Sequence, residues 1–271
     1  MPELPEVETT RRGLLRHLVG RRIRGVEVRN RNLRWPVPRD LQARLRGERV
    51  RDIHRRGKYL LFDCGEGHLL VHLGMSGRLT IVPEDQPAKA HDHVDLMLEG
   101  SQRLRLTDPR RFGAMLWVRG PVERHALLRG LGLEPLEPGF DGAALKKLAA
   151  GRRVAVKHFL MNGRLVTGVG NIYASEALFR ARIHPLRSVA RISAESWDRL
   201  ARAVRTTLEE ALAAGGTTLR DYASLEGRVG EFGTRCAVYG REGLPCEVCG
   251  TPIRALRQGQ RSTFYCPECQ R

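Results

Sequence analysis

Lysine, long hydrophobic runs and internal repeats are scarce or missing in this sequence. Only five of the 47 basic residues are lysine, which fits a genome that favours arginine codons. No window approaches the roughly 20 apolar residues that span a bilayer. The first residues, Met1–Glu6, lack the apolar core of a secretory signal peptide. We therefore expect a soluble, cytoplasmic protein that does not associate with membranes.

Positive charge is abundant and unevenly placed. The net charge is +17 and the isoelectric point about 10.7. Residues 1–60 hold 17 Lys and Arg against 7 Asp and Glu, so ten of the 17 net charges lie there. Whatever its genomic origin, such an excess attracts phosphate strongly, and it indicates a polyanionic partner.

The first half of the chain predicts one helix followed by short strands. Apolar residues at helical spacing and two early prolines indicate a helix over residues 3–19. Short strands broken by turn residues then indicate a β-sandwich or barrel, with a surface loop at 83–92. The clearest strands are Arg24–Arg29, Tyr59–Phe62, His68–His72, Val94–Leu98 and Arg103–Leu106.

The second half is predicted to be helical. The Gly- and Pro-rich stretch 130–140 is typical of a linker, and helical periodicity continues over 142–214. Ser193 has the position and chemistry of a helix N-cap. Residues 217–236 are polar and contain scattered glycines, which favours a loop.

Four cysteines near the C-terminus form the strongest local motif. Two C-x-x-C pairs, Cys246 with Cys249 and Cys266 with Cys269, are separated by 16 residues that predict a hairpin around Gly259. This spacing is typical of a four-thiolate zinc site, and two disulfides are the alternative. Such a zinc is structural because all four positions are filled. The remaining Cys64 and Cys236 are interpreted as ordinary buried thiols.

The N-terminus carries a second candidate motif. Removal of Met1 would leave Pro2 with a secondary amine, which can condense with an aldehyde as catalytic lysines do. Glu3 and Glu6 lie on the adjacent turn and could exchange protons. The same residues are also ordinary helix-start residues, so the motif alone leaves both interpretations open.

A third motif, Gly168–Phe179, places glycines at the start of a helix near Asn171. Exposed backbone N–H groups at a helix N-terminus bind anions. In so basic a chain the anion would be a DNA phosphate, although an ordinary turn is the alternative.

Six segments in order resemble the formamidopyrimidine-DNA glycosylase (8-oxoguanine-DNA glycosylase) family over essentially the whole chain. They are Met1–Glu8, Arg56–Leu60, His72–Gly77, Thr107–Gly113, Gly168–Phe179 and the four-cysteine tail. The resemblance implies an α+β, multidomain fold. Its expected parts are a β-sandwich domain with the N-terminal helix over 1–133, a helix–two-turns–helix domain over 134–236 and a zinc finger β-hairpin over 237–271.

The resemblance also implies an activity. The expected enzyme excises oxidised purines from duplex DNA and then cleaves the strand by β,δ-elimination, acting as a monomer near the bacterial nucleoid. Pro2 would be the nucleophile and Glu3 the general acid. Lys58 would serve β-elimination and Arg261 δ-elimination, while a phosphate contact or an ordinary hairpin arginine are their respective alternatives.

Further residues match DNA-contact positions of the family. Met75, Arg110 and Phe112 would fill the gap left by the extruded base, with Arg110 facing the orphaned cytosine. For Met75 and Phe112, packing in the core is the alternative. The positions expected to hold the DNA backbone are His72, His91, Arg152, Lys157 and Asn171.

Two other segments bear on the resemblance. Asn162-Gly163 stands where the family is expected to have an acidic residue followed by Gln or Asn, which puts a local hydrogen bond in doubt. The loop 217–236 resembles the segment that closes over 8-oxoguanine in the purine-specific branch.

Three other functions remain as alternatives. Endonuclease VIII-like glycosylases act on oxidised pyrimidines and share Pro2 and Glu3, but Leu4 favours the purine branch. A non-catalytic DNA-binding protein would need neither a free proline amine nor Lys58. An N-terminal-proline tautomerase would explain Pro2 but neither the cysteines nor the charge.

Overall fold

The computed structural model describes residues 2–216 and 232–271, which fall into two compact units. Among the described residues, the first unit comprises 2–129 with 215–216, and the second comprises Gly130–Ala214 and Phe232–Arg271. The helical region and the cysteine-rich tail thus belong to one unit. The finer division at 133 and 236 stays a prediction.

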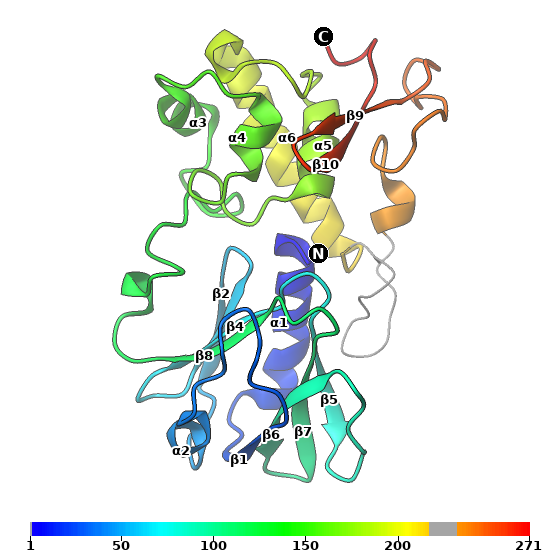
Figure 1. The fold of residues 1–271 in the computed structure, drawn as a ribbon. Helices are drawn as coiled ribbons and strands as arrows, with labels where there is room; N and C mark the ends of the chain where they lie inside the picture. Colours follow the sequence, from blue (N-terminus) through cyan, green and yellow to red (C-terminus); the bar gives the residue numbers. More distant parts are fainter. Residues whose placement is uncertain (1, 217–231) are drawn as a thin grey trace. The chain divides into compact units, whose positions relative to one another are not determined.

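Two four-stranded antiparallel sheets form the first unit (Figure 1). One sheet has the order β1-β6-β7-β5 and the other β2-β3-β4-β8. The strands are β1 Ile23–Val28, β2 Asp52–Arg56, β3 Tyr59–Asp63, β4 His68–His72, β5 Arg78–Pro83, β6 Asp92–Leu98, β7 Gln102–Thr107 and β8 Ala114–Val118. A short helix, α2 (Leu41–Leu45), and a 3-10 turn, η1 (Val122–Arg124), complete the unit. The expected β-sandwich is confirmed.

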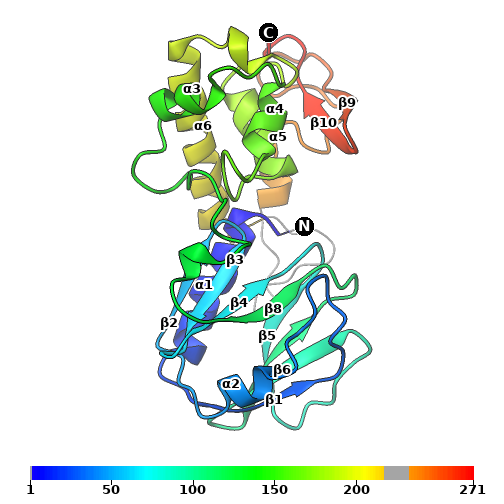
Figure 2. The ribbon, with the colours of Figure 1, turned by 60° about the vertical axis from the view of Figure 1, so that its left-hand side comes forward.

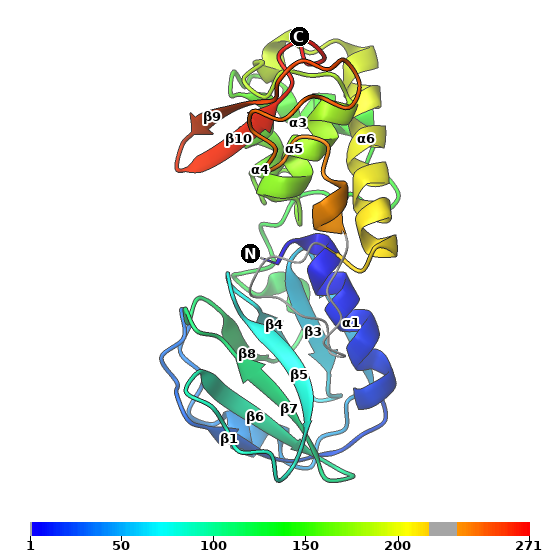
Figure 3. The same ribbon diagram turned by 90° about the vertical axis from the view of Figure 1, so that its right-hand side faces the viewer.

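The sandwich core includes the inner side of helix α1 (Leu4–Leu18), which lies alongside the sheets in Figure 3. Val7, Leu14 and Leu18 are almost fully buried and belong to one cluster with Ile53 of β2 and Leu60 of β3. The helix therefore begins and ends within one residue of the predicted range 3–19. The apolar residues whose spacing predicts the helix are the same residues that pack against the sandwich.

An ionic cluster around the buried Glu8 attaches the same helix to β2. The Glu8 carboxylate accepts hydrogen bonds from Arg11 and Arg12 of α1 and from Arg55 of β2, at 2.8–3.2 Å. Burial alone raises the pKa of Glu8, but hydrogen bonds from Arg11 and Arg12, and the charges of Arg11 and Arg55, together lower this pKa to about 2. Arg11 also donates to the carbonyl of Ile53. The start of α1 is thus fixed by polar as well as apolar contacts.

The second unit contains four helices and a hairpin (Figure 2). The helices are α3 Gly142–Ala149, α4 Val156–Met161, α5 Asn171–Arg180 and α6 Ala194–Ala213, with 3-10 turns η2 (Val189–Arg191) and η3 (Phe232–Arg235). Strands β9 (Arg254–Gln258) and β10 (Arg261–Tyr265) pair around Gly259, as predicted. The Ser193 side chain caps α6, which confirms its expected role.

Some features differ from the sequence prediction. Strands β2, β5 and β8 are additional to the clearest strands named from the sequence, and they lie within the region predicted to form short strands. Residues 232–235, predicted as loop, form the 3-10 turn η3. The rest of that predicted lesion-capping loop, 217–231, lies outside the described residues. In the described ranges no helix is long and apolar enough to cross a membrane.

The Glu8 cluster makes a testable contribution to stability. Because Glu8 has a folded-state pKa of about 2, its contribution is complete above the ordinary pKa of a glutamate and is lost as the pH falls toward 2. We expect Glu8→Gln to lower the free energy of unfolding at pH 7 by roughly 2 kcal/mol. The difference from wild type should shrink between about pH 4.5 and pH 2.

Urea unfolding of both proteins across this pH range measures the effect. The control is Asp40→Asn, since Asp40 forms an exposed pair with Arg44 on the same unit. Exposed pairs contribute about 0–1 kcal/mol. Equal losses in the two variants would contradict a special role for Glu8.

Candidate functional site

The start of α1 holds Pro2 and Glu3, and both residues are buried. Glu3 is the N-cap, and its backbone N–H donates to Glu6 Oε2 at 2.8 Å. Pro5 fits in the first turn because the missing N–H has no partner inside a helix. Pro2 and Glu3 are therefore held by the helix that follows, and the Glu3 carboxyl group is next to Pro2 in sequence.

Lys58 and His72 are neighbours in the sheet that contains β3 and β4. Lys58 comes after Gly57 in the two-residue turn between β2 and β3, where Gly57 adopts a φ of 57° that suits this turn. His72 pairs with Tyr59, the residue after Lys58, and their rings lie 4.7 Å apart. The structure thus brings these two predicted residues into one place.

His72 is an uncharged donor in this setting. Burial, together with the charges of Lys58 and Arg34, lowers the pKa of His72 to about 4. Its Nδ1 lies 3.1 Å from the N–H of Gly74 and accepts from it, which leaves the proton on Nε2. A neutral imidazole N–H of this kind can donate to a phosphate oxygen without adding charge.

Met75, Arg110 and Phe112 lie on two adjoining turns of the first unit, and we call them the wedge trio. Met75 is 38% exposed and Phe112 39% exposed, so neither side chain is packed in the core. The Arg110 guanidinium lies 5.0 Å from the centre of the Phe112 ring. His91, also exposed, accepts a backbone hydrogen bond from Asp108 in the same region. The first unit thus presents these predicted DNA-contact side chains at its surface.

In the second unit, three of the predicted residues line a cavity of about 330 Å³. Lys157 of α4, Asn171 at the start of α5 and Arg261 of β10 all contribute to its lining. The hairpin lies next to α4 and α5 in Figures 2 and 3. Arg152 is exposed in the segment between α3 and α4 and does not line this cavity.

Two of these residues also bind the hairpin itself. Lys157 is only 1% exposed, and its Nζ donates to Thr263 Oγ1 at 2.7 Å. The Asn171 amide donates to the carbonyl of Ser262 at 3.0 Å, while its buried Oδ1 has no hydrogen-bond partner among the described residues. A ligand donor at this helix start would satisfy that oxygen. Lys157 therefore fixes the hairpin in addition to any contact with DNA.

The four cysteines of the tail converge on one point. Their sulfur atoms lie within 4.8 Å of one another, and three of the pairs are 3.5–3.9 Å apart. Tetrahedral zinc with Zn–S bonds of about 2.3 Å requires sulfur atoms about 3.8 Å apart. All four are free thiols, which argues against the disulfide alternative. Cys246, Cys249, Cys266 and Cys269 thus fit one structural zinc ion, and no position is left open for catalysis.

Buried polar groups tie this zinc module to the helices. Glu176 of α5 accepts hydrogen bonds from the backbone N–H groups of Ala237, Val238 and Tyr239 at 2.8–3.0 Å. Gln270, 1% exposed, accepts from the N–H of Cys266 and donates to the carbonyl of Ile183. Sequence patterns indicate neither residue, because their partners are backbone groups of distant segments.

Other predictions about single residues have clear outcomes. Cys64 and Cys236 are buried thiols, as expected, and burial raises the pKa of Cys64 to about 12. The Asn162 side chain accepts a hydrogen bond from the N–H of Arg164 at 3.0 Å. An asparagine oxygen therefore makes a local hydrogen bond at the turn where an acidic residue was expected.

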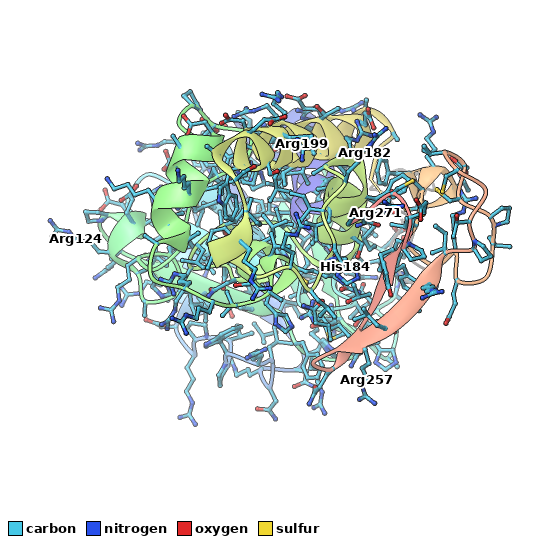
Figure 4. The ribbon with its side chains drawn as sticks, turned by 90° about the horizontal axis from the view of Figure 1, so that it is seen from above. Arg124, Arg182, His184, Arg199, Arg257 and Arg271 are labelled. Atoms are coloured by element: carbon cyan, nitrogen blue, oxygen red, sulfur yellow. The ribbon has the colours of Figure 1, made fainter. Side chains whose placement is uncertain are left out.

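Exposed basic side chains are also found in the second unit. Figure 4 labels Arg182, Arg257 and Arg271 among them, and all three are exposed. Such charges lend non-specific affinity for a nucleic acid backbone.

Comparisons with known proteins cover the whole chain. Residues 1–115 match the formamidopyrimidine-DNA glycosylase N-terminal domain, 131–223 its H2TH domain, and 243–271 the zinc finger found in FPG and IleRS. Formamidopyrimidine-DNA glycosylases from Methylococcus capsulatus and Cupriavidus pinatubonensis are each 56% identical, with all of both chains covered.

Solved structures agree with these matches. The crystal structure of the MutM (FPG) protein from Thermus thermophilus has a TM-score of 0.89 at 42% identity, covering 99% of this chain and 98% of that one. A variant of Lactococcus lactis FPG in complex with a Fapy-dG containing DNA has a TM-score of 0.93 at 32% identity, with both chains fully covered. With its sandwich, helical unit and four-cysteine finger, this chain belongs to the formamidopyrimidine-DNA glycosylase family.

Proposed function

We propose that this DNA repair glycosylase removes oxidised purines with Pro2 as its nucleophile. The main structural support is the pair of buried residues Pro2 and Glu3 at the start of α1. The hydrogen bond from the Glu3 backbone N–H to the Glu6 carboxylate fixes this pair. Base excision needs a nucleophile at C1′ and an acid nearby, and a secondary amine beside a carboxyl group supplies both. Its relatives are named formamidopyrimidine-DNA glycosylases, which is the name of the purine-specific branch. This favours oxidised purines as substrates over the oxidised pyrimidines on which endonuclease VIII-like enzymes act.

This pair accounts for the covalent steps of base excision. The Pro2 nitrogen forms a bond to C1′ as the bond from C1′ to the base breaks, and the departing base takes up a proton. Glu3 protonates O4′, the sugar ring opens and the nitrogen loses its proton, which leaves an iminium ion. Removal of Met1 is a requirement, because an amide nitrogen could not take this role.

Strand cleavage proceeds from the same iminium ion. Loss of a proton from C2′ expels the 3′ phosphate, and a second elimination expels the 5′ phosphate. We assign Lys58 to the first elimination and Arg261 to the second. Water then hydrolyses the iminium ion and frees Pro2. The neutral His72 and the exposed His91 and Arg152, with Lys157 and Asn171, hold the DNA backbone.

The wedge trio lowers the cost of extruding the base. Unstacking a paired base costs a few kcal/mol, and an apolar side chain that enters the gap offsets part of this cost. The exposure of Met75 and Phe112 supports this role, because folding leaves them available to DNA. The Arg110 guanidinium can donate to the orphaned cytosine. We further propose that the enzyme acts as a monomer near the nucleoid, in the cytoplasm.

Covalent trapping tests the nucleophile. Borohydride reduces the iminium ion, so lesion-containing DNA should become covalently attached to the protein at Pro2. A retained Met1 or an N-terminal tag should abolish this trapping while DNA binding survives, whereas a C-terminal tag should have no effect. Intact mass of protein and adduct reports both Met1 removal and attachment. Efficient trapping by a protein with a blocked N-terminus would rule out Pro2.

Metal content tests the four-cysteine site. We expect about one zinc ion per chain, and Cys249→Ala should lose it and weaken DNA binding, because structural zinc supplies folding energy to its module. The sandwich should stay folded. Cys236→Ala serves as the control, since this buried thiol lies in the same unit outside the four-cysteine cluster. Elemental analysis that finds no zinc in the active enzyme would contradict the assignment.

Excision from two kinds of duplex tests the wedge trio. Phe112→Ala should slow single-turnover excision of 8-oxoguanine paired with cytosine much more than excision of the same lesion in a bulge, where extrusion costs less. Pro2→Gly should fail on both duplexes apart from weak activity of its primary amine. Arg110→Ala should also blunt the preference for cytosine opposite the lesion. An equal loss on both duplexes for Phe112→Ala would mean that Phe112 has a structural role only.

A further inference from the structure

The wedge trio stands on two separate segments of the chain. Met75 lies in the turn between β4 and β5, and Arg110 and Phe112 lie between β7 and β8. The two segments touch closely: a Cβ added at Gly74 would lie 2.5 Å from the carbonyl carbon of Phe112. Neither Met75 nor Phe112 is packed in the core, so another contact has to set their mutual position.

Asp108 provides that contact. Its Oδ1 accepts a hydrogen bond from the Ser76 hydroxyl at 3.1 Å, and its Oδ2 accepts one from the N–H of Gly113 at 2.8 Å. The Ser76 oxygen in turn accepts from the N–H of Arg110 at 3.3 Å. One carboxylate thereby joins the residue after Met75, the residue after Phe112 and, through Ser76, the backbone of Arg110.

Asp108 itself is firmly held. Its side chain is completely buried. Its backbone N–H donates to the carbonyl of His91, and its carbonyl lies 2.8 Å from Nε2 of the buried His93. The carbonyl also accepts from the N–H of Arg111, a non-glycine residue in the left-handed region at a φ of 56°. Such a backbone conformation persists only where its surroundings enforce it.

We propose that Asp108 is a positioning residue that fixes Met75, Arg110 and Phe112 as one preformed wedge. This inference rests on the proposed function of the trio. A wedge made of long side chains on two unconnected turns would lose conformational freedom each time it entered DNA, and that loss would weaken its effect. Joining the turns beforehand through a buried carboxylate removes this cost. Asp108 thus acts on base extrusion without touching the DNA.

Asp108→Asn tests the link with little change in volume. An amide has one accepting oxygen and one donating NH₂ group, so it can accept from Gly113 only as an uncharged oxygen, and toward Ser76 its NH₂ group would donate, which reverses the direction of that hydrogen bond. A hydrogen bond to a charged group is worth about tenfold in an equilibrium. We expect Asp108→Asn to slow excision from the paired 8-oxoguanine·cytosine duplex about tenfold more than from a bulge. Ser76→Ala removes the bonds of the Ser76 hydroxyl to Asp108 and Arg110 but leaves the bond between Gly113 and a charged Asp108, so it should have a smaller effect in the same direction.

Extrusion of the damaged base can also be measured separately from its excision. A 2-aminopurine base placed next to the lesion becomes fluorescent when its neighbour leaves the stack. Asp108→Asn should reduce this signal on the paired duplex and leave it nearly unchanged on the bulged one. An unchanged signal on the paired duplex would overturn the proposal.

A matched control separates positioning from general stability. Asp95 is equally buried in the same unit and forms ion pairs with Arg105 and Arg29. Asp95→Asn should lower the melting temperature without changing the ratio of the two excision rates. The same behaviour in Asp108→Asn would overturn the proposal, since the residue would then only stabilise the sandwich.

The double variant Asp108→Asn/Phe112→Ala completes the test. If Asp108 acts through the trio, the ratio of excision rates on the bulged and paired duplexes should be nearly the same in the double variant as in Phe112→Ala alone. Fully additive effects of the two substitutions on this ratio would overturn the link. If Phe112→Ala itself slows both duplexes equally, the proposed wedge fails. If Phe112→Ala discriminates and Asp108→Asn does not, only the role of Asp108 fails.

Discussion

The attachment of α1 to β2 is the constraint on which the candidate active site depends. The nucleophile proposed here is Pro2 after removal of Met1, and it would have no preceding residues to hold it, so its position would be set by the residues after it. Here those residues form α1, which is fixed by the apolar Val7, Leu14 and Leu18 and by the Glu8 carboxylate. Because Arg55 belongs to β2, the Glu8 cluster fixes the rotation of the helix as well as its depth. Pro2 and Glu3 inherit that orientation.

Buried polar groups play a comparable part in the second unit. The cluster around the cysteines contains few apolar side chains, led by Val238 and Ile253. A module this small needs a metal or similar staple to stay folded. Zinc alone would not orient it, however, and Glu176, Lys157 and Gln270 connect it to α5, to α4 and to the segment after α5. The hairpin that carries Arg261 is positioned by these contacts.

Sequence patterns predicted local features well and long-range polar contacts poorly. The range of α1, the hairpin around Gly259 and the four-cysteine cluster could be predicted from spacing alone, since each depends on neighbours in the chain. The resemblance to the family indicated the wedge trio, whose exposure the structure then revealed. Asp108 lies inside one of the matching motifs without an assigned role, because its partner Ser76 lies 32 residues away. Likewise, nothing in the sequence connects Glu176 to the backbone at 237–239.

Affinity for DNA in general and selectivity for a lesion depend on different kinds of residue. Exposed arginines attract any duplex, and this attraction weakens with salt because it depends on released counterions. Some of the groups proposed to contact the DNA are of a different kind: His72 is neutral, and Met75 and Phe112 are apolar. Their contributions depend on geometry and not on net charge. Under the proposed function, a protein so rich in arginine can bind any duplex and still act selectively, provided that the residues of its site are rigidly placed. In the proposed arrangement, the buried side chains of Glu8 and Asp108 serve that placement, because each accepts hydrogen bonds that join separate segments of the first unit.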